Sequence, residues 1–202
     1  KSGTSFGHSR VASCRTARTG QDRGVLTVTL GYIKTMARGQ ADLQLTELAD
    51  LLISRGMCVG GVVQSNTTCG DNDLCDMDVR TLPDGPVFRI SQSLGAGSRG
   101  CRLDPAALEQ AVGCVTKALD DASGTDVQLL IVNKFGKHEA DGRGFRPVIA
   151  EAMMSGIPVL TAVNPTNLDA FEAFAGGMAT CLPSELPALL DWVAQVQNPE
   201  AA

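Results

Sequence analysis

The most constraining feature of the sequence is an alternation of short apolar runs with amphipathic segments at helical spacing. Residues 127–132, VQLLIV, form the clearest run, which is typical of a buried central strand in a parallel sheet. Similar runs occur at residues 25–30, 58–64 and 157–163. Leucines at near-helical spacing follow the first of these runs, and Asp104 supplies the N-cap of a later helix. The pattern predicts an α/β fold: a single three-layer domain whose mostly parallel sheet is covered by helices on both faces.

The start of the chain differs in composition from the rest. The first 23 residues carry five Lys and Arg residues and one acid, Asp22, whereas residues 24–202 carry a net charge of −9. Because the first segment lacks apolar periodicity, we expect residues 1–23 to form a disordered basic tail and residues 24–202 to form the α/β domain. A stretch rich in Arg and Ser and poor in acids is also compatible with a transit peptide.

The composition argues against several classes of function. The chain has 202 residues, a net charge of −5 and only 4% aromatic residues. Nucleic-acid binders are usually basic and often stack bases on aromatic rings, so we expect no nucleic-acid partner. No window approaches 18 consecutive apolar residues and the chain starts without an apolar signal segment, so we expect no membrane partner and a cytoplasmic protein. Neither composition nor motif identifies a cofactor.

A glycine-rich segment at residues 94–100 is the first candidate for ligand binding. It follows a short predicted strand and leads into a helix, and ligands of doubly wound sheets bind beyond the carboxyl ends of strands. Its backbone N–H groups could converge on an anion, and two guanidinium groups could add bidentate contacts. The candidate residues here are Gln92, Gly97, Ser98, Arg99, Gly100 and Arg102.

The second candidate segment, residues 133–144, directly follows the clearest strand. It contains Asn133, Lys134, Lys137 and Arg143 among three glycines. Its position at the carboxyl end of a strand favours contact with a ligand. The alternative is a solvated charge run whose acids and bases pair with one another.

A third segment offers one thiol and two carboxylates within four residues. Cys75, Asp76 and Asp78, with Cys101 from the glycine-rich region, could hold a metal ion. The spacing of Cys69 and Cys75 is not that of a zinc knuckle. The segment could instead contact a cationic ligand, or be a loop anchored by its own side-chain hydrogen bonds.

We expect these three segments to share one ligand site. Residues 95–102 and 133–144 leave strands at their carboxyl ends, and residues 75–78 lie in a long loop that starts at such an end. The carboxylates of Asp76 and Asp78 would balance part of the cationic cluster.

Several of these segments resemble a bacterial protein family of uncharacterised function. The resemblance spans about residues 25–195, and its members are often encoded beside molybdate-transport genes. It therefore implies a possible place in molybdate handling. The matching stretches are residues 75–78, 90–95, 100–105, 129–137, 142–147 and 156–160.

That family is distantly similar to small nucleoside-triphosphatases of P-loop fold. Those enzymes carry Asp-Glu-Ile-Gly-Lys after a central strand, whereas this chain has Asn133 and Lys134 in place of the two acids. The nearest match to a P-loop, Gly39-Gln40-Ala41, lacks both the phosphate-binding Lys and the Mg²⁺-binding hydroxyl. The resemblance thus implies a P-loop-NTPase-like fold with a degenerate P-loop, in which two parts of phosphoryl-transfer catalysis are missing.

Three hypotheses of function follow. The first is a protein that binds a small anion, molybdate or a nucleotide-like ligand, without NTP hydrolysis. The second is a nucleoside-triphosphatase with a rebuilt site, in which Asp76, Asp78 or Glu139 holds Mg²⁺. The third is a metal or redox sensor built on the cysteines of the polar loops. The residues favour the first, because fixed cations and backbone N–H groups recognise tetrahedral oxyanions without any chemistry.

Overall fold

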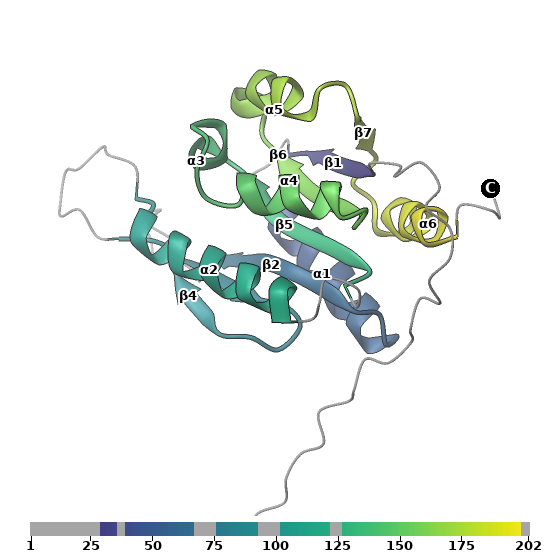
Figure 1. Ribbon diagram of the computed structural model, residues 1–202, viewed down its shortest axis with the longest axis horizontal. Helices are drawn as coiled ribbons and strands as arrows, with labels where there is room; N and C mark the ends of the chain where they lie inside the picture. The colour runs from purple at the N-terminus through teal and green to yellow at the C-terminus, as the bar shows by residue number, and fades with distance from the viewer. Residues whose placement is uncertain (1–28, 36–38, 67–75, 93–101, 122–126, 199–202) are drawn as a thin grey trace, which may run out of the picture.

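The computed structural model shows one sheet with helices on both faces (Figure 1). The three-layer α/β fold expected from the sequence is therefore confirmed. The expected basic tail, residues 1–23, lies outside the described residues and stays a prediction. Among the residues that are described, no helix is long and apolar enough to cross a membrane. The described residues are 29–35, 39–66, 76–92, 102–121 and 127–198.

The sheet has seven strands in the order β4-β3-β2-β5-β6-β1-β7. The five strands from β2 to β7 in this order run parallel, and β3 and β4 extend the sheet as an antiparallel hairpin beside β2. The central position of β5 agrees with its continuous apolar run. The strands are β1 (Leu30–Lys34), β2 (Val59–Asn66), β3 (Met77–Thr81), β4 (Val87–Arg89), β5 (Leu129–Phe135), β6 (Val159–Val163) and β7 (Ala179–Leu182).

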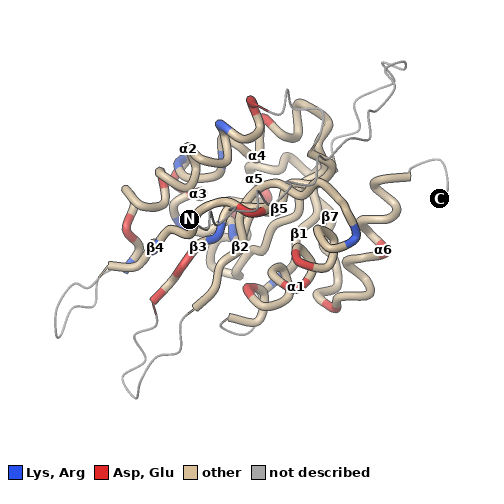
Figure 2. Tube along the Cα trace, turned by 90° about the horizontal axis from the view of Figure 1, so that it is seen from below, with Lys and Arg blue, Asp and Glu red and all other residues tan. Residues whose placement is uncertain are grey.

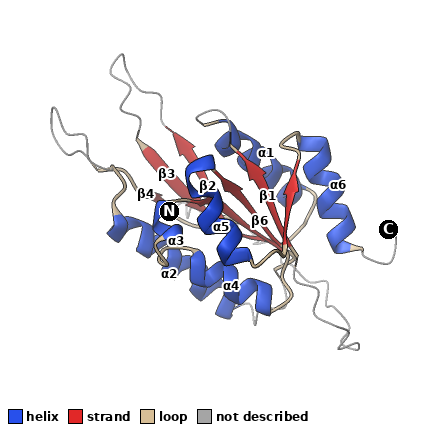
Figure 3. Ribbon diagram, turned by 90° about the horizontal axis from the view of Figure 1, so that it is seen from above, coloured by secondary structure: helices blue, strands red, loops and turns tan. Residues whose placement is uncertain are grey.

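Two groups of helices cover the sheet. On one face, α1 and α6 pack with the strands in one apolar cluster, and on the other face α2, α4 and α5 pack in a second (Figure 3). The helices are α1 (Gln40–Ser54), α2 (Pro105–Asp121), α3 (Lys137–Ala140), α4 (Arg146–Met154), the 3-10 helix η1 (Pro165–Asn167), α5 (Leu168–Ala175) and α6 (Leu186–Gln197).

The first strand extends beyond the run expected at residues 25–30. Gly31, the residue directly after that run, lies inside β1, and the strand continues to Lys34. A Cβ atom at Gly31 would lie 2.8 Å from the side chains of Leu182 and Trp192. Glycine is therefore needed here because α6 packs closely against β1.

The central strand also continues through two residues that we expected in a loop. The apolar run ends at Val132, but β5 ends at Phe135 and includes Asn133 and Lys134. Thr161 of β6 explains the extension: its hydroxyl donates to the Val132 carbonyl at 2.7 Å and accepts the N–H of Phe135 at 3.2 Å. One side chain thus spans the irregularity in the ladder between β5 and β6.

Two neighbouring parallel strands send the chain to opposite faces of the sheet. After β1 the chain enters α1 on one face, and after β6 it enters α5 on the other. Such a reversal leaves a crevice at the carboxyl ends of the strands, where ligands bind in open α/β sheets. We call this edge of the sheet the carboxyl edge. The end of β5 also lies there, and the candidate site is at this edge.

Candidate functional site

The start of α1 lies at the carboxyl edge and receives no side-chain cap from its N-cap residue. That residue is Gly39, with a φ of +78°. Helix starts leave backbone N–H groups unpaired and carry a partial positive charge. The position therefore has the general properties of an anion site.

A buried carboxylate lies in the first turn of this helix. Asp42 is 4% exposed, and its Oδ2 accepts a hydrogen bond from Asn66 Nδ2 at 2.6 Å. Its Oδ1 lies 3.8 Å from the Nζ atom of Lys134. Asn66 Oδ1 in turn accepts a hydrogen bond from Gln64 Nε2 at 2.9 Å. Polar residues of α1, β2 and β5 therefore form one connected network at the carboxyl edge.

Asn133 has the most unusual environment among the described polar side chains. It is 3% exposed, and neither its Oδ1 nor its Nδ2 has a hydrogen-bond partner. Asn133 lies on β5 where the ladder with β6 becomes irregular, directly before Lys134, whose Nζ atom lies near Asp42 of α1. Buried polar groups are nearly always paired, and each unpaired one costs about 1–3 kcal/mol. An unpaired amide at the carboxyl end of the central strand therefore points to a ligand.

Two candidate residues, Gln92 and Arg102, flank the glycine-rich segment and are joined by a hydrogen bond. The N–H of Gln92 donates to the carbonyl of Arg102 at 2.7 Å, and Gln92 Nε2 donates to the carbonyl of Leu103 at 2.8 Å. The guanidinium of Arg102 lies 3.6 Å from Asp76. The remaining candidates of this segment, Gly97, Ser98, Arg99 and Gly100, lie outside the described residues.

The carboxylates of the candidate metal segment contact arginine. Arg89 lies 2.8 Å from Asp76 and 3.0 Å from Asp78. Within the described ranges, no group of three or more His, Cys, Asp or Glu residues is placed to hold a metal ion. The cysteines of this hypothesis, Cys69, Cys75 and Cys101, lie outside those ranges, so the metal site stays a prediction.

Buried Glu139 closes the turn that follows β5. Its Oε2 accepts the N–H of Gly136 at 2.9 Å, and its Oε1 accepts the N–H of Phe145 at 3.1 Å. Burial raises the pKa of Glu139, while these backbone hydrogen bonds act in the opposite direction. Gly144 has a φ of +59° and lies so close to Glu139 that a Cβ atom at this position would collide with the Glu139 carboxylate. Both oxygens of the Glu139 carboxylate are thus hydrogen-bonded to the backbone of its own turn.

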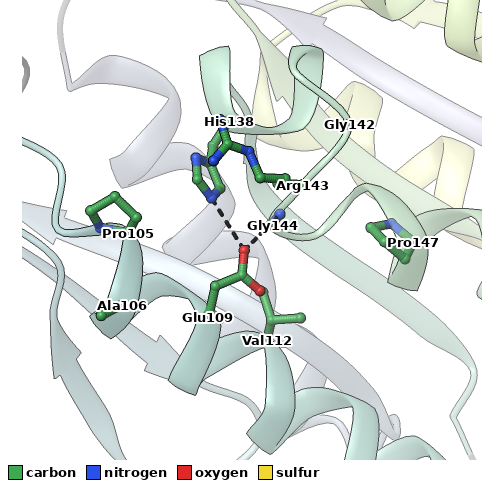
Figure 4. Close-up of a pocket in the computed structure, with 9 residues that line it drawn as sticks. All are labelled: Pro105, Ala106, Glu109, Val112, His138, Gly142, Arg143, Gly144 and Pro147. Carbon is green, nitrogen blue, oxygen red and sulfur yellow. Dashed lines mark hydrogen bonds and ion pairs between the residues drawn. The ribbon is translucent and has the colours of Figure 1, made fainter.

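A pocket of about 580 Å³ lies between α2, this turn and the start of α4 (Figure 4). His138 and Arg143 line it from the turn, and Glu109 lines it from α2. Glu109 Oε1 accepts the N–H of Gly144 at 3.0 Å and lies 3.1 Å from His138 Nε2. These contacts tie α2 to the turn. The remaining lining residues are Pro105, Ala106, Val112, Gly142 and Pro147.

Among the described residues, the candidate cations do not gather into one exposed basic patch. Basic and acidic positions are interspersed along the described chain (Figure 2). Three of the candidate cations each contact a different carboxylate, one of which, Asp76, also contacts Arg89, while Arg143 lines the pocket at α2. The three pairs are Lys134–Asp42 at 3.8 Å, Arg102–Asp76 at 3.6 Å and Lys137–Asp141 at 3.2 Å. A ligand shared by Lys134 and Arg102 stays a prediction.

Sequence reasoning missed Asp42, which the structure places at the centre of the network. The available signal was an acid in the first turn of a predicted helix, directly after the degenerate P-loop match. Acids are common at that position because they interact favourably with the helix dipole, so the signal is not specific.

Residues 30–192 match the model of a family described as "Protein of unknown function (DUF2478)". The chain is also 39% identical over 157 residues to molybdenum import ATP-binding protein ModC 2 of Bradyrhizobium diazoefficiens. That match covers 77% of this chain but 17% of the relative, so the chain corresponds to about a sixth of the length of that protein.

The fold is similar to the solution structure of a human cancer-related nucleoside triphosphatase. The TM-score is 0.59, and the match covers 84% of this chain and 97% of that one. At 19% sequence identity the likeness concerns the fold alone. It confirms the P-loop-NTPase-like architecture that the sequence resemblance implied.

Proposed function

We propose that this chain, which belongs to the DUF2478 family, binds a small oxyanion or the phosphate of a nucleotide at the carboxyl edge and does not hydrolyse nucleoside triphosphates. The observation that carries the proposal is the buried, unpaired amide of Asn133. Its nitrogen can donate to a ligand oxygen, and its oxygen can accept from a ligand hydroxyl or amino group. A nucleotide has donors and acceptors that would satisfy both groups, whereas a small oxyanion without a hydroxyl would satisfy the nitrogen.

Lys134 adds positive charge beside this amide. Its side chain is 36% exposed, and its Nζ lies 3.8 Å from Asp42, which is longer than a good hydrogen bond. The ammonium group therefore keeps donors that it can offer to a ligand. With the start of α1, it makes the carboxyl edge suitable for one anionic group.

The residues around the degenerate P-loop support binding without hydrolysis. Gln40 and Ala41 occupy the positions where a working P-loop has its Lys and its Mg²⁺-binding hydroxyl. Three acids were candidates to rebuild a Mg²⁺ site, and each already has other partners. Asp76 and Asp78 contact arginine, and Glu139 accepts two backbone hydrogen bonds.

Molybdate is the first oxyanion to test. The chain is similar to part of a protein named as a molybdenum import ATP-binding protein, and that name supports a role in molybdate handling. Molybdate is also a tetrahedral oxyanion of the kind that a lysine and helix N–H groups recognise.

The test is calorimetric titration with molybdate, sulfate, ATP and GTP, with and without Mg²⁺. We expect at least one of the four to bind, and we expect Asn133→Leu to weaken that binding by about tenfold or more, as for a hydrogen bond to a charged group. Asn198→Leu, which changes an exposed asparagine at the end of α6, is the matched control. Binding of none of the four would refute the proposal. Phosphate release on the order of 1 s⁻¹ would refute the absence of hydrolysis.

A further inference from the structure

The proposed site already contains a negatively charged side chain, the carboxylate of Asp42. The Asp42 side chain is 6% exposed, lies in the first turn of α1 and faces Lys134 at 3.8 Å. We infer that Asp42 competes with the oxyanion ligand for Lys134 and for the start of α1, and thereby sets how much negative charge the site accepts. This inference rests on the proposed function of the carboxyl edge.

Asp42 has two described side-chain partners, Asn66 and Lys134, and their contacts show which of the two can move away to a ligand. Asn66 holds the other carboxylate oxygen by a hydrogen bond of 2.6 Å, and Asn66 is itself held by Gln64. Asp42 is therefore fixed from the β2 side without Lys134. The lysine side chain is 36% exposed and makes the longer contact, so it is the group that can turn towards a ligand. Asp42 would then stay in place as a buried negative charge beside the ligand.

A buried carboxylate at this distance discriminates by charge. Its repulsion of a ligand grows in proportion to the ligand's charge and offsets the attraction of Lys134, which grows in the same proportion. The desolvation cost, which is larger for a doubly charged anion, then remains uncompensated. The site as built therefore favours a singly charged oxyanion over a doubly charged one of the same shape. Asn133 fits this reading, because a neutral amide adds hydrogen bonds without adding positive charge.

The test compares two tetrahedral anions of similar shape, molybdate with two negative charges and perrhenate with one. Asp42→Asn should tighten molybdate binding by about tenfold, equivalent to about 1.4 kcal/mol, and perrhenate binding by roughly threefold. Asp50→Asn is the matched control, because it makes the same charge change on the same helix at an exposed residue that contacts Arg80. Its effect on both anions should stay within about twofold, as expected for an exposed charge.

A second variant, Asp42→Ser, tests the same inference if the Asp42→Asn protein does not fold. Asp42→Ser also removes the charge and places a residue that helix starts tolerate, and it should give the same gain. If both variants bind the anions no better than the Asp50→Asn protein, the inference is wrong while the proposed function stands. If removing the carboxylate abolishes a Mg²⁺-dependent binding of ATP, Asp42 holds metal and the inference is also wrong. If neither wild type nor variants bind any oxyanion or nucleotide, the proposed function itself fails.

Discussion

The residues after Val132 form two regions that differ in whether their buried polar groups are hydrogen-bonded within the chain. In the turn around α3, the carboxylate of Glu139 accepts two backbone N–H groups, and Glu109 accepts a third from the same turn. At the end of β5, a few residues earlier, both polar atoms of Asn133 are buried without a partner. Both regions belong to the charged segment 133–144, in which the glycines lie only in the turn.

The difference separates a structural use of polar residues from a functional one. A buried polar group that is fully bonded within the chain stabilises the fold and has little left to offer a ligand. A group that stays unpaired at the crevice between strands lowers stability unless something outside the chain satisfies it. We therefore expect the buried acids of the turn to stabilise the fold and the end of β5 to serve the proposed ligand binding, and the predictions below test that division.

The largest expected effect is that of Glu139→Ala. The substitution leaves the N–H groups of Gly136 and Phe145 unpaired and opens a cavity in the turn. We expect the free energy of unfolding to fall by about 3 kcal/mol and the melting midpoint by roughly 6–12 °C. Glu151→Ala, at an exposed position of α4, is the control and should change little. A loss of less than about 1 kcal/mol would show that Glu139 does not hold the turn.

A pair of glycine variants tests the same turn at smaller cost. Gly144→Ala should destabilise the protein by about 2 kcal/mol or more, because its φ of +59° is strained for alanine and its Cβ would meet Glu139. Gly142→Ala shares the strain, with a φ of +90°, but its Cβ would have no atom within 4 Å. It should lose about 1 kcal/mol. Equal losses in urea unfolding would mean that the contact with Glu139 does not matter.

The end of β5 should respond in the opposite direction. Asn133→Leu removes an unpaired amide and keeps the number and the branching of the side-chain heavy atoms. We expect the free energy of unfolding to rise by about 1 kcal/mol. A gain in stability together with a loss of ligand binding would show that the fold carries Asn133 for function. A clear loss of stability would mean that the amide has a structural role in the unliganded protein.

The fold could be predicted from the sequence because its signals are local. Apolar runs identify the strands, and Asp104 identifies the start of α2, where its Oδ1 accepts the N–H groups of Ala106 and Ala107. The end of β5 could not be predicted in this way. Its last residues are held by the hydroxyl of Thr161, which is 26 residues away from Phe135 in the sequence.

The candidate site was predicted only in part, for the same physical reason. Asn133 and Lys134 were candidates because they follow the apolar run of the central strand, near the edge where ligands of such folds bind, and their role in binding stays a prediction. The network around Asp42 depends on α1, β2 and β5 meeting in space, which no spacing in the sequence reveals. The pairing of Lys137 with Asp141 is local, but four-residue spacing of opposite charges is too common to exclude a ligand-binding role.

The smallest expected effect is a pH dependence that belongs to the turn alone. Because burial raises the pKa of Glu139, the folded protein binds a proton at this site more readily than the unfolded chain does. The free energy of unfolding should therefore fall as pH rises from the ordinary glutamate pKa through the raised one. Glu139→Gln has no group that titrates there, and its amide oxygen can still accept one of the two backbone N–H groups. Urea unfolding between about pH 4 and about 7 should show a downward slope in the wild type that Glu139→Gln lacks. Parallel slopes would mean that the carboxylate is as well solvated by its two backbone hydrogen bonds as it is by water.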